Sequence, residues 1–381
     1  MFLDEVKESP TLEMVNLVLE KKTKGEKVIS LAIGDPSFQT PKEIVDAACK
    51  SMKEGDVHYV HSYGTMDVRN AIMEKVARKN GIKASIGNVM FMATKLSVFV
   101  SLYATLEQGS EVLMPDPGFL YAEPIVLAGG RPIYYRLSED FSLDMNEIRK
   151  KVTDRTRAIM VNSPSNPTGK ILTKSELREL YEFCYDKKIF IIADEAYEDL
   201  TYGKPHFATG SLETKPEIVI SLFSLSKSYS MTGWRAGYVV AGEAVLDLMS
   251  KFIDYTLTCF PPFIMQASAY AIRNGDKFTQ QFQEEYAKRR QQLLERISET
   301  KELEVGDIEG TFYAFPRYRS KLGSRELCKR VLERENVAIL PGVVFGPAGE
   351  NHVRISFSVS PETIDTGMDG VRRFFADLPR S

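Results

Sequence analysis

Cysteine is scarce in this sequence, and long apolar runs are missing. The 381 residues include four cysteines, with no Cys-x-x-Cys pair and no histidine at zinc-ligand spacing, so we expect neither a disulfide scaffold nor a metal site. No apolar stretch reaches the ~18 residues of a membrane-spanning helix. Asp4, Glu5 and Glu8 stand where a signal peptide is apolar. The sequence therefore predicts a cytoplasmic protein with no membrane partner.

An excess of charge of either sign is also absent. Lys and Arg total 49 and Asp and Glu total 52, which gives a formal net charge of −3. This balance argues against a strongly basic nucleic-acid-binding protein. The composition, 43% hydrophobic and 27% charged, is that of ordinary globular proteins. The length suits two or three domains, or one large domain with a smaller one.

Short apolar runs alternate with helical patterns between residues 88 and 240. Residues 173–187 repeat apolar side chains at helical spacing, with Thr173 and Glu176 placed to form a capping box and Cys184 on the apolar face. The alternation predicts an α/β domain with a mostly parallel sheet flanked by helices. Seven runs are typical of strands buried on both faces: Val89–Met92, Val112–Met114, Ile133–Tyr135, Ala158–Val161, Phe190–Ala193, Ile218–Leu222 and Gly237–Val240.

The pattern changes in the last third of the chain. Helices and strands without regular alternation are typical of a smaller α+β domain. The first 41 residues show little beyond the strand-like Val28–Ile33, so we expect them to pack against this small domain. The predicted division is residues 1–41, a large cofactor-binding domain at 42–275 and a small domain at 276–381. The C-terminal elements expected are a charged helix from Asp276 to about Thr300 and short strands at Phe312–Phe315, Val337–Leu340 and Val353–Phe357.

Three polar clusters follow predicted strands. Ser224-Leu225-Ser226-Lys227, with Arg235 close behind, gathers hydroxyls, an amine and a guanidinium on one connection, which suits an anion site beside a lysine. Asn166-Pro167-Thr168-Gly169 and Asp194-Glu195-Ala196-Tyr197 lie at the carboxyl ends of strands, where open α/β sheets bind ligands. Taken singly, each cluster has a simple structural alternative: an exposed loop, a turn or a helix N-cap.

Together, in this order and spacing, the clusters resemble the class I and II aminotransferases, the fold-type I pyridoxal-phosphate enzymes of the aspartate aminotransferase type. The resemblance covers nearly the whole chain. It implies the fold-type I architecture and a pyridoxal 5'-phosphate cofactor. Further matches are Gly34-Asp35-Pro36-Ser37-Phe38, Tyr59 with Gly64 and Arg69, Pro115-Asp116-Pro117-Gly118-Phe119, Pro341-Gly342 and Val353-Arg354-Ile355-Ser356-Phe357.

The resemblance implies roles for the residues expected around the cofactor ring. Lys227 would bond to the cofactor aldehyde and then move a proton at the substrate α-carbon. Asp194 would face the pyridine nitrogen and keep it protonated. Asn166 and Tyr197 would donate hydrogen bonds to O3′, and Phe119 would stack on the ring, where relatives often place Tyr or Trp. Lys227, Asp194 and Tyr197 are thus the catalytic candidates.

The same resemblance implies a site for the cofactor phosphate. Ser224, Ser226 and Arg235 are expected to hold it, together with the backbone amides of Ala93-Thr94-Lys95 at the start of a helix. Relatives often carry glycine where Ala93 and Thr94 stand. Alanine fits there if its φ is negative, and the Thr94 hydroxyl would be available for a further contact.

For the substrate, the resemblance implies that Arg354 binds the α-carboxylate through a bidentate pair, with Gly34 and Asn166 close to the same group. Lys95 offers a cation beside the cofactor for a side-chain carboxylate. Tyr59 resembles the residue that reaches from one subunit to the phosphate of the other, so a homodimer with shared sites is expected.

These residues predict an aminotransferase that moves the amino group of an L-amino acid to a 2-oxo acid by a ping-pong mechanism. Aspartate with 2-oxoglutarate is the lead pair, and aromatic amino acids are the alternative donors. A β-lyase or carbon-sulfur lyase on the same scaffold is a second enzyme alternative, because the fold does not dictate which bond breaks. A cofactor-sensing regulator of DNA is the non-enzymatic alternative, and the short segment before Gly34 argues against it.

Overall fold

The large central sheet has seven strands and a mostly parallel arrangement. The structure, a computed structural model, describes residue 6 and residues 10–378. The strand order is β2-β8-β7-β6-β5-β3-β4, with β8 antiparallel to both neighbours and every other pair parallel. The predicted α/β class is confirmed. The strands are β2 (Val89–Phe91), β3 (Glu111–Asp116), β4 (Arg131–Arg136), β5 (Thr156–Asn162), β6 (Phe190–Asp194), β7 (Val219–Ser224) and β8 (Gly237–Val240).

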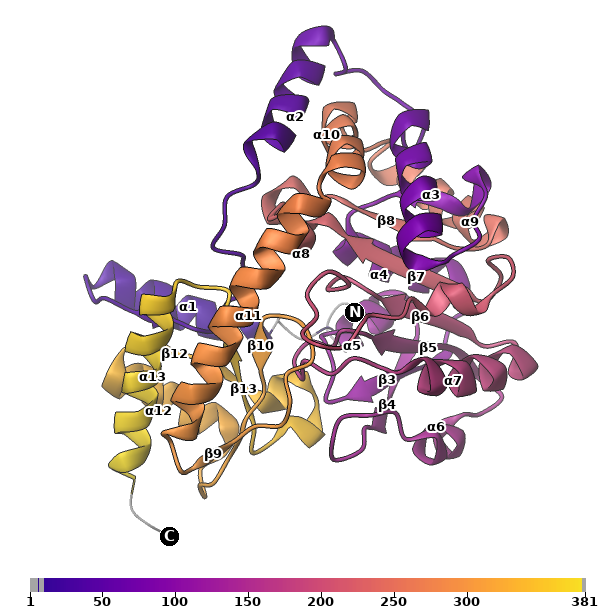
Figure 1. Cartoon of the computed structure of the whole chain (residues 1–381). Helices are drawn as coiled ribbons and strands as arrows, with labels where there is room; N and C mark the ends of the chain where they lie inside the picture. The colour runs from indigo at the N-terminus through magenta and orange to yellow at the C-terminus, as the bar shows by residue number, and fades with distance from the viewer. Residues whose placement is uncertain (1–5, 7–9, 379–381) are drawn as a thin grey trace.

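Helices lie on both sides of this sheet (Figure 1). The predicted capping box is present: the Thr173 hydroxyl accepts from the Glu176 amide at 3.2 Å, and a Glu176 carboxylate oxygen accepts from the Thr173 amide at 2.8 Å. Cys184 is fully buried, as expected from its place on the apolar face. The helices are α2 (Lys42–Glu54), α3 (Met66–Asn80), α4 (Thr94–Thr105), α5 (Ala122–Leu127), α6 (Met145–Lys151), α7 (Lys174–Lys187), α8 (Leu225–Ser228), α9 (Glu243–Thr256) and α10 (Pro262–Asn274).

The C-terminal part of the chain forms three helices around short strands. A three-stranded sheet has the order β10-β14-β13, and it holds Arg354 in its middle strand. The helices are α11 (Asp276–Ser298), α12 (Ser324–Glu335) and α13 (Pro361–Ala376). The strands are β9 (Leu303–Glu304), β10 (Tyr313–Ala314), β11 (Arg317–Tyr318), β12 (Val337–Ala338), β13 (Leu340–Pro341) and β14 (Val353–Ser356).

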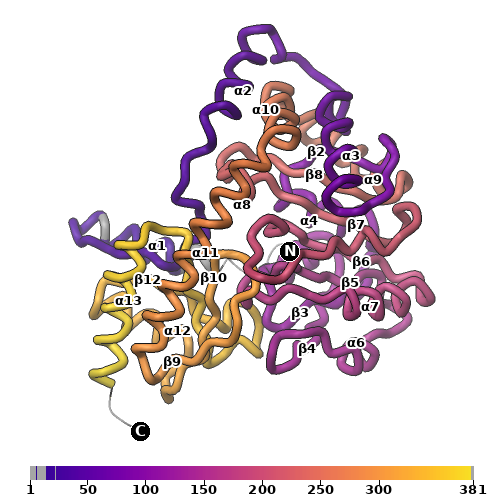
Figure 2. Tube along the Cα trace, viewed as in Figure 1, coloured from indigo at the N-terminus to yellow at the C-terminus, as the bar shows by residue number. Residues whose placement is uncertain are grey.

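The N-terminal segment lies beside this C-terminal part, as Figures 1 and 2 show for the indigo and yellow ends of the chain. It contains α1 (Pro10–Thr23) and β1 (Ile29–Ser30), and β1 pairs in parallel with β12. Met14, Val18 and Leu31 belong to the same buried cluster as the apolar residues of α12 and α13. Within the predicted segment 1–41, residues 1–5 and 7–9 lie outside the described residues.

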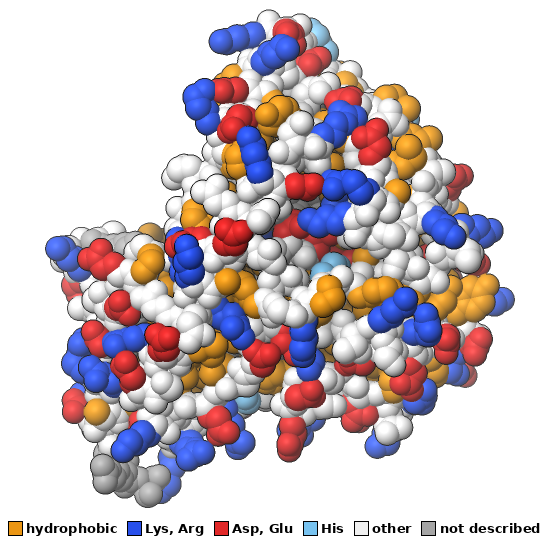
Figure 3. Space-filling model, in the orientation of Figure 1, with side chains coloured by type: hydrophobic (Ala, Val, Ile, Leu, Met, Phe, Trp, Pro, Cys, Tyr) orange, Lys and Arg blue, Asp and Glu red, His pale blue; other side chains and the backbone are white. Residues whose placement is uncertain are grey.

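The surface has no large area of one charge on the face that Figure 3 shows, where Lys and Arg alternate with Asp and Glu. In the part of the chain that the structure describes, no helix combines the length and the apolar character needed to cross a membrane.

Candidate active site

A cavity of about 370 Å³ opens at the carboxyl ends of the central strands. Asn162, Asp194 and Ser224, the last residues of β5, β6 and β7, line it from the sheet. The opposite wall comes from the N-terminal segment and from the C-terminal part. Among the predicted residues, those lining the cavity are Gly34, Thr94, Lys95, Phe119, Asn166, Asp194, Tyr197, Ser224, Ser226, Lys227, Arg235 and Arg354.

Two predicted residues lie away from the cavity wall. Ala93 is buried as the N-cap of α4, directly before Thr94. Tyr59 is 84% exposed on the surface of this single chain and does not line the cavity. Any contact between Tyr59 and a ligand in this cavity therefore requires another chain or a rearrangement.

Asp194 is a buried carboxylate held by two donors. Its Oδ2 accepts a hydrogen bond from the Tyr121 hydroxyl at 2.8 Å, and its Oδ1 accepts from the Ala196 amide at 3.2 Å. Burial raises the pKa of Asp194 to about 6, although the hydrogen bond from Tyr121 opposes the shift. A cationic group in the cavity next to Asp194 would find an oriented anion.

Arg354 is buried and fixed on two of its three nitrogens. Nη1 donates to Oδ1 of Asn166 at 3.0 Å, and Nη2 donates to the Ala32 carbonyl at 2.7 Å. Nε is buried and has no hydrogen-bond partner among the described residues. Burial lowers the pKa of Arg354 from its ordinary value. This guanidinium therefore has a donor available for a bound carboxylate, and its contact with Oδ1 leaves the Asn166 amide nitrogen as a donor.

Lys227 is the amine of the cavity. Its Nζ donates to the Gly34 carbonyl at 2.6 Å and lies 5.5 Å from the Phe312 ring centroid. Burial lowers the pKa of Lys227, because the low-dielectric surroundings disfavour the ammonium. A lysine with a lowered pKa loses its proton more readily and is a better nucleophile.

The end of the cavity that suits an anion lies at the start of α4. Ala93 has φ −58°, the negative value that alanine requires, and α4 has no side-chain cap. The first amides of the helix therefore remain available to an anion. Across from them, the Ser224 hydroxyl accepts from the Ser226 amide at 3.2 Å, and the exposed Arg235 donates to the Thr232 carbonyl. The Thr94 hydroxyl instead donates to the Phe223 carbonyl at 2.8 Å, so its proton is already used.

These groups fit pyridoxal phosphate: an amine for its aldehyde, a carboxylate for its ring nitrogen and uncapped helix amides for its phosphate. Phe119 lines the same cavity and packs edge-on against the Tyr121 ring at 5.5 Å. An aromatic ring in this place suits a flat ligand.

Several residues of the site escaped sequence analysis. Tyr121 and Tyr313 meet the cavity groups through hydroxyls, and Asn162 links two motifs by donating to the Asp194 carbonyl and accepting from the Asn166 amide. The position of Asn162, a polar residue ending an apolar strand, was an available signal. The apolar side of the cavity, which no motif indicated, comes from Met14, Val15, Val18, Ile33, Val98, Leu120 and Leu340.

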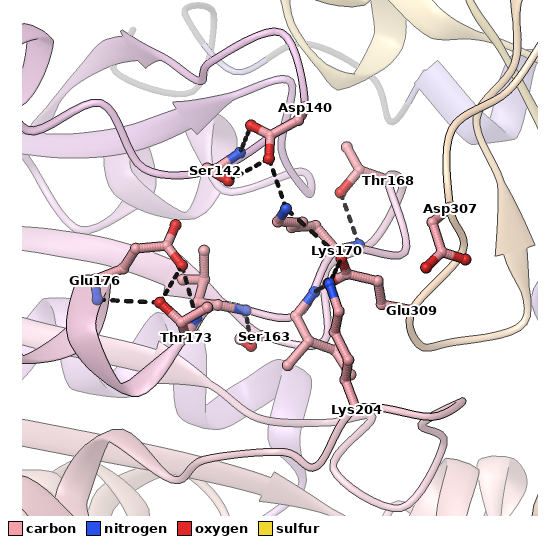
Figure 4. Close-up of polar contacts among 12 residues, drawn as sticks. Asp140, Ser142, Ser163, Thr168, Lys170, Thr173, Glu176, Lys204, Asp307 and Glu309 are labelled. Atoms are coloured by element: carbon pink, nitrogen blue, oxygen red, sulfur yellow. Dashed lines mark hydrogen bonds and ion pairs between the residues drawn. The ribbon is translucent and has the colours of Figure 1, made fainter.

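The loop that carries Asn166 is tied to the C-terminal part by one buried carboxylate, Glu309 (Figure 4). Glu309 accepts from the Ile171 amide at 2.9 Å and pairs with Lys204. Lys170 lies between Asp140, at 2.8 Å, and Glu309, at 3.6 Å. We call Glu309 with these partners the Glu309 anchor.

The chain is similar to known proteins over nearly its full length. A family model described as aminotransferase class I and II matches residues 26–371. An aspartate aminotransferase of Pyrococcus abyssi is 36% identical over 355 residues, covering 91% of each chain. Aromatic-amino-acid aminotransferase 2 of Thermococcus litoralis is 35% identical over 379 residues, covering 96% of this chain and 97% of that protein.

A solved structure agrees with these similarities. An alanine aminotransferase from Pyrococcus furiosus superposes with a TM-score of 0.94 at 32% identity and covers 99% of both chains. These three relatives are named for aspartate, for aromatic amino acids and for alanine, so similarity alone leaves the amino donor open.

Proposed function

The chain belongs to the class I and II aminotransferases, which are pyridoxal-phosphate-dependent enzymes, and we propose that it moves the amino group of an L-amino acid to a 2-oxo acid such as 2-oxoglutarate in a ping-pong reaction. One observation carries this proposal: a single cavity presents the Lys227 amine, the Asp194 carboxylate and the Arg354 guanidinium. A β-lyase on the same scaffold is the alternative reaction.

Pyridoxal phosphate, when bound, supplies an aldehyde that captures amino groups and a ring that accepts electrons. Lys227 would hold the aldehyde and later accept the proton from the substrate α-carbon, and its lowered pKa favours the neutral amine that both roles require. Asp194 would keep a proton on the ring nitrogen. Asn166 and Tyr197 would donate to O3′, and Phe119 would cover a ring face. Ser224, Ser226, Arg235 and the amides of Ala93, Thr94 and Lys95 would hold the phosphate.

The α-carboxylate of the substrate is assigned to Arg354. Its buried Nε supports this assignment, because a carboxylate would supply the acceptor that the described chain lacks. Gly34 and Asn166 border the same place. The neutral Asn166 side chain keeps Arg354 oriented without cancelling its charge.

Aspartate is the proposed lead donor, with Lys95 meeting its side-chain carboxylate. Lys95 lines the cavity and is exposed at the first turn of α4. Aromatic amino acids are the second candidate, favoured by the apolar wall that Met14, Val15 and Val18 of α1 contribute. An apolar wall binds an aromatic side chain by removing its surface from water.

A homodimer with shared sites is proposed for the assembly. Large apolar side chains are exposed on this chain, including Tyr59 at 84% and Tyr255 at 92%. Such side chains are typical of subunit interfaces when they gather in one patch, and Tyr59 would reach the partner's phosphate site. Others with high exposure are Val57, Met66, Tyr103, Leu248 and Leu257.

We also propose the division of the chain into a segment at 1–41, a large domain at 42–275 and a small domain at 276–381. Separate buried clusters support this division. The cluster of the small domain is made of residues within 14–32 and 282–375, and Tyr197 and Leu200 are its members from the large domain.

A cytoplasmic location is proposed because all four cysteines are free, as in reducing compartments.

A coupled assay tests the reaction. Purified protein is incubated with aspartate or phenylalanine, with and without 2-oxoglutarate, and glutamate, pyruvate and ammonia are measured. We expect sustained glutamate formation only when both substrates are present, and its loss in Lys227→Ala but not in the surface control Lys277→Ala. Cystathionine, whose β-sulfur can leave, is the donor that tests the alternative: continuous release of pyruvate and ammonia from it without 2-oxoglutarate would instead establish the lyase.

A further inference from the structure

Tyr313 lines the cavity and contacts two other groups of the site. We propose that Tyr313 is a positioning residue that orients both the Tyr197 hydroxyl, which faces the cofactor, and the Arg354 guanidinium, which faces the substrate. The inference rests on the proposed aminotransferase function. It assigns to one side chain the link between the cofactor end and the substrate end of the cavity.

The first contact joins two buried phenols. The hydroxyls of Tyr197 and Tyr313 are 3.2 Å apart, and both side chains are almost fully buried. One hydroxyl donates and the other accepts. Since Tyr197 is assigned to donate to O3′, its oxygen is the acceptor and Tyr313 is the donor. A donor behind Tyr197 polarises its O–H bond and strengthens the hydrogen bond that it makes forward.

The second contact is with the guanidinium of Arg354. Its Cζ lies 4.1 Å from the Tyr313 ring centroid and 5.0 Å from that of Phe345. These rings restrict the plane of the guanidinium, while Asn166 and Ala32 hold its terminal nitrogens. Tyr313 thus limits the direction in which the free Nε points.

The position of Tyr313 is itself over-determined. Strand β10 pairs Tyr313 with Ser356, which lies two residues after Arg354 on β14. One sheet therefore holds Tyr313 and Arg354 in place relative to each other. A Cβ on Gly34 would lie 1.6 Å from the Tyr313 hydroxyl oxygen, so glycine at position 34 makes room for this phenol. The Glu309 anchor fixes the preceding segment to the Asn166 loop (Figure 4). Tyr313 therefore has little freedom to move away.

Two variants separate the two contacts. Tyr313→Phe removes the hydroxyl and keeps the ring, whereas Tyr313→Leu removes both. Tyr286→Phe is the matched control, because the buried Tyr286 hydroxyl has no partner among the described residues and does not line the cavity. Each protein is loaded with pyridoxal phosphate. Its visible absorbance is titrated with pH, and its dissociation constant for maleate and for 3-phenylpropionate is measured by calorimetry.

We expect Tyr313→Phe to move the midpoint of the absorbance titration to higher pH. A weaker donor at O3′ leaves more electron density on the cofactor to hold the titrating proton. In Tyr313→Phe, the dissociation constant for the carboxylate that wild-type protein binds, maleate or 3-phenylpropionate, should stay within about twofold of the wild-type value. In Tyr313→Leu that constant should rise about tenfold, because the guanidinium loses one of the rings that set its plane.

An unchanged midpoint in Tyr313→Phe, or an unchanged dissociation constant in Tyr313→Leu, overturns the inference. Equal shifts in Tyr286→Phe overturn it too, because they would show a general response to losing a buried hydroxyl. Failure of the proposed function looks different, since wild-type protein would then take up no cofactor or would show no transfer of amino groups.

Discussion

The floor and the rim of the cavity differ in how firmly the chain holds their polar groups. The floor, formed by Asp194, Asn166 and Tyr197, is buried, and each residue has a hydrogen-bond partner from another element. The rim, formed by Lys95 and Arg235, is exposed, and within the described part of the chain its one side-chain hydrogen bond joins Arg235 to the Thr232 carbonyl, three residues away.

This difference separates preorganised chemistry from adjustable binding. Floor groups are in place before any ligand arrives, so the reaction does not have to orient them. Rim groups are hydrated, and their attraction to a ligand is weakened by water and salt. Substitutions in the floor should therefore cost far more activity than substitutions in the rim.

The strongest test of this contrast is Asp194→Asn. The amide keeps the size of the side chain but loses the charge that holds a proton on the ring nitrogen. We expect kcat to fall by about 100-fold or more, which corresponds to roughly 3 kcal/mol in the barrier. Steady-state kinetics and cofactor content are the measurements.

Asp116→Asn is the matched control for that variant. Asp116 is also buried with a pKa raised to about 6 by burial, but it accepts from the Ala348 amide outside the cavity. If both variants lost activity equally, the loss would reflect a buried carboxylate in general, and the assigned role of Asp194 would be wrong.

A smaller effect is expected from Tyr121→Phe, which keeps Asp194 and removes a donor to it. Burial already raises the pKa of Asp194 to about 6, and the Tyr121 hydrogen bond opposes that shift. Without the hydroxyl the pKa rises further, so the ionised form is lost at a higher pH as the pH falls. In the loaded enzyme the cationic ring nitrogen lowers the pKa of Asp194 from that value, but the direction of the change is the same. The acid limb of kcat/KM should therefore move to higher pH by about one pH unit, which corresponds to about 1.4 kcal/mol.

Tyr135→Phe controls for the loss of a buried phenol. The Tyr135 hydroxyl donates to the Met160 carbonyl at 2.8 Å and does not line the cavity. Its removal should leave the pH profile where it is. Superimposable profiles for wild type and Tyr121→Phe would show that the Tyr121 hydroxyl does not control the ionisation of Asp194.

Much of the large sheet was predictable, because a strand buried on both faces appears as a continuous apolar run. All seven predicted runs correspond to strands β2 to β8. The C-terminal strands were predictable only in outline. The expected run Val28–Ile33 contains just β1 at Ile29–Ser30, and Val337–Leu340 splits into two strands of two residues each. Helix α1 has a weakly patterned sequence and was missed.

The cavity residues show the same limit. Lys227, Asp194 and Asn166 follow strands within recognisable motifs, so their approximate place was predictable. Tyr121 and Tyr313 were not, because their hydrogen bonds join residues 73 and 116 positions apart in the chain. Such contacts depend on how elements far apart in the chain pack together, which no local pattern records.

The smallest loss of activity is expected for Lys95→Ala, a substitution in the rim. A cation at a helix N-terminus is unfavourable unless an anion compensates, and the cofactor phosphate and a substrate carboxylate are the available anions. Because Lys95 is exposed, its contact with a dicarboxylate should contribute about 1 kcal/mol, or roughly fivefold in kcat/KM for aspartate. Phenylalanine has no second carboxylate and should be affected less than twofold. Equal losses for both donors would assign Lys95 to the cofactor or the helix, and the apolar wall of α1 would then make aromatic amino acids the better-supported substrates.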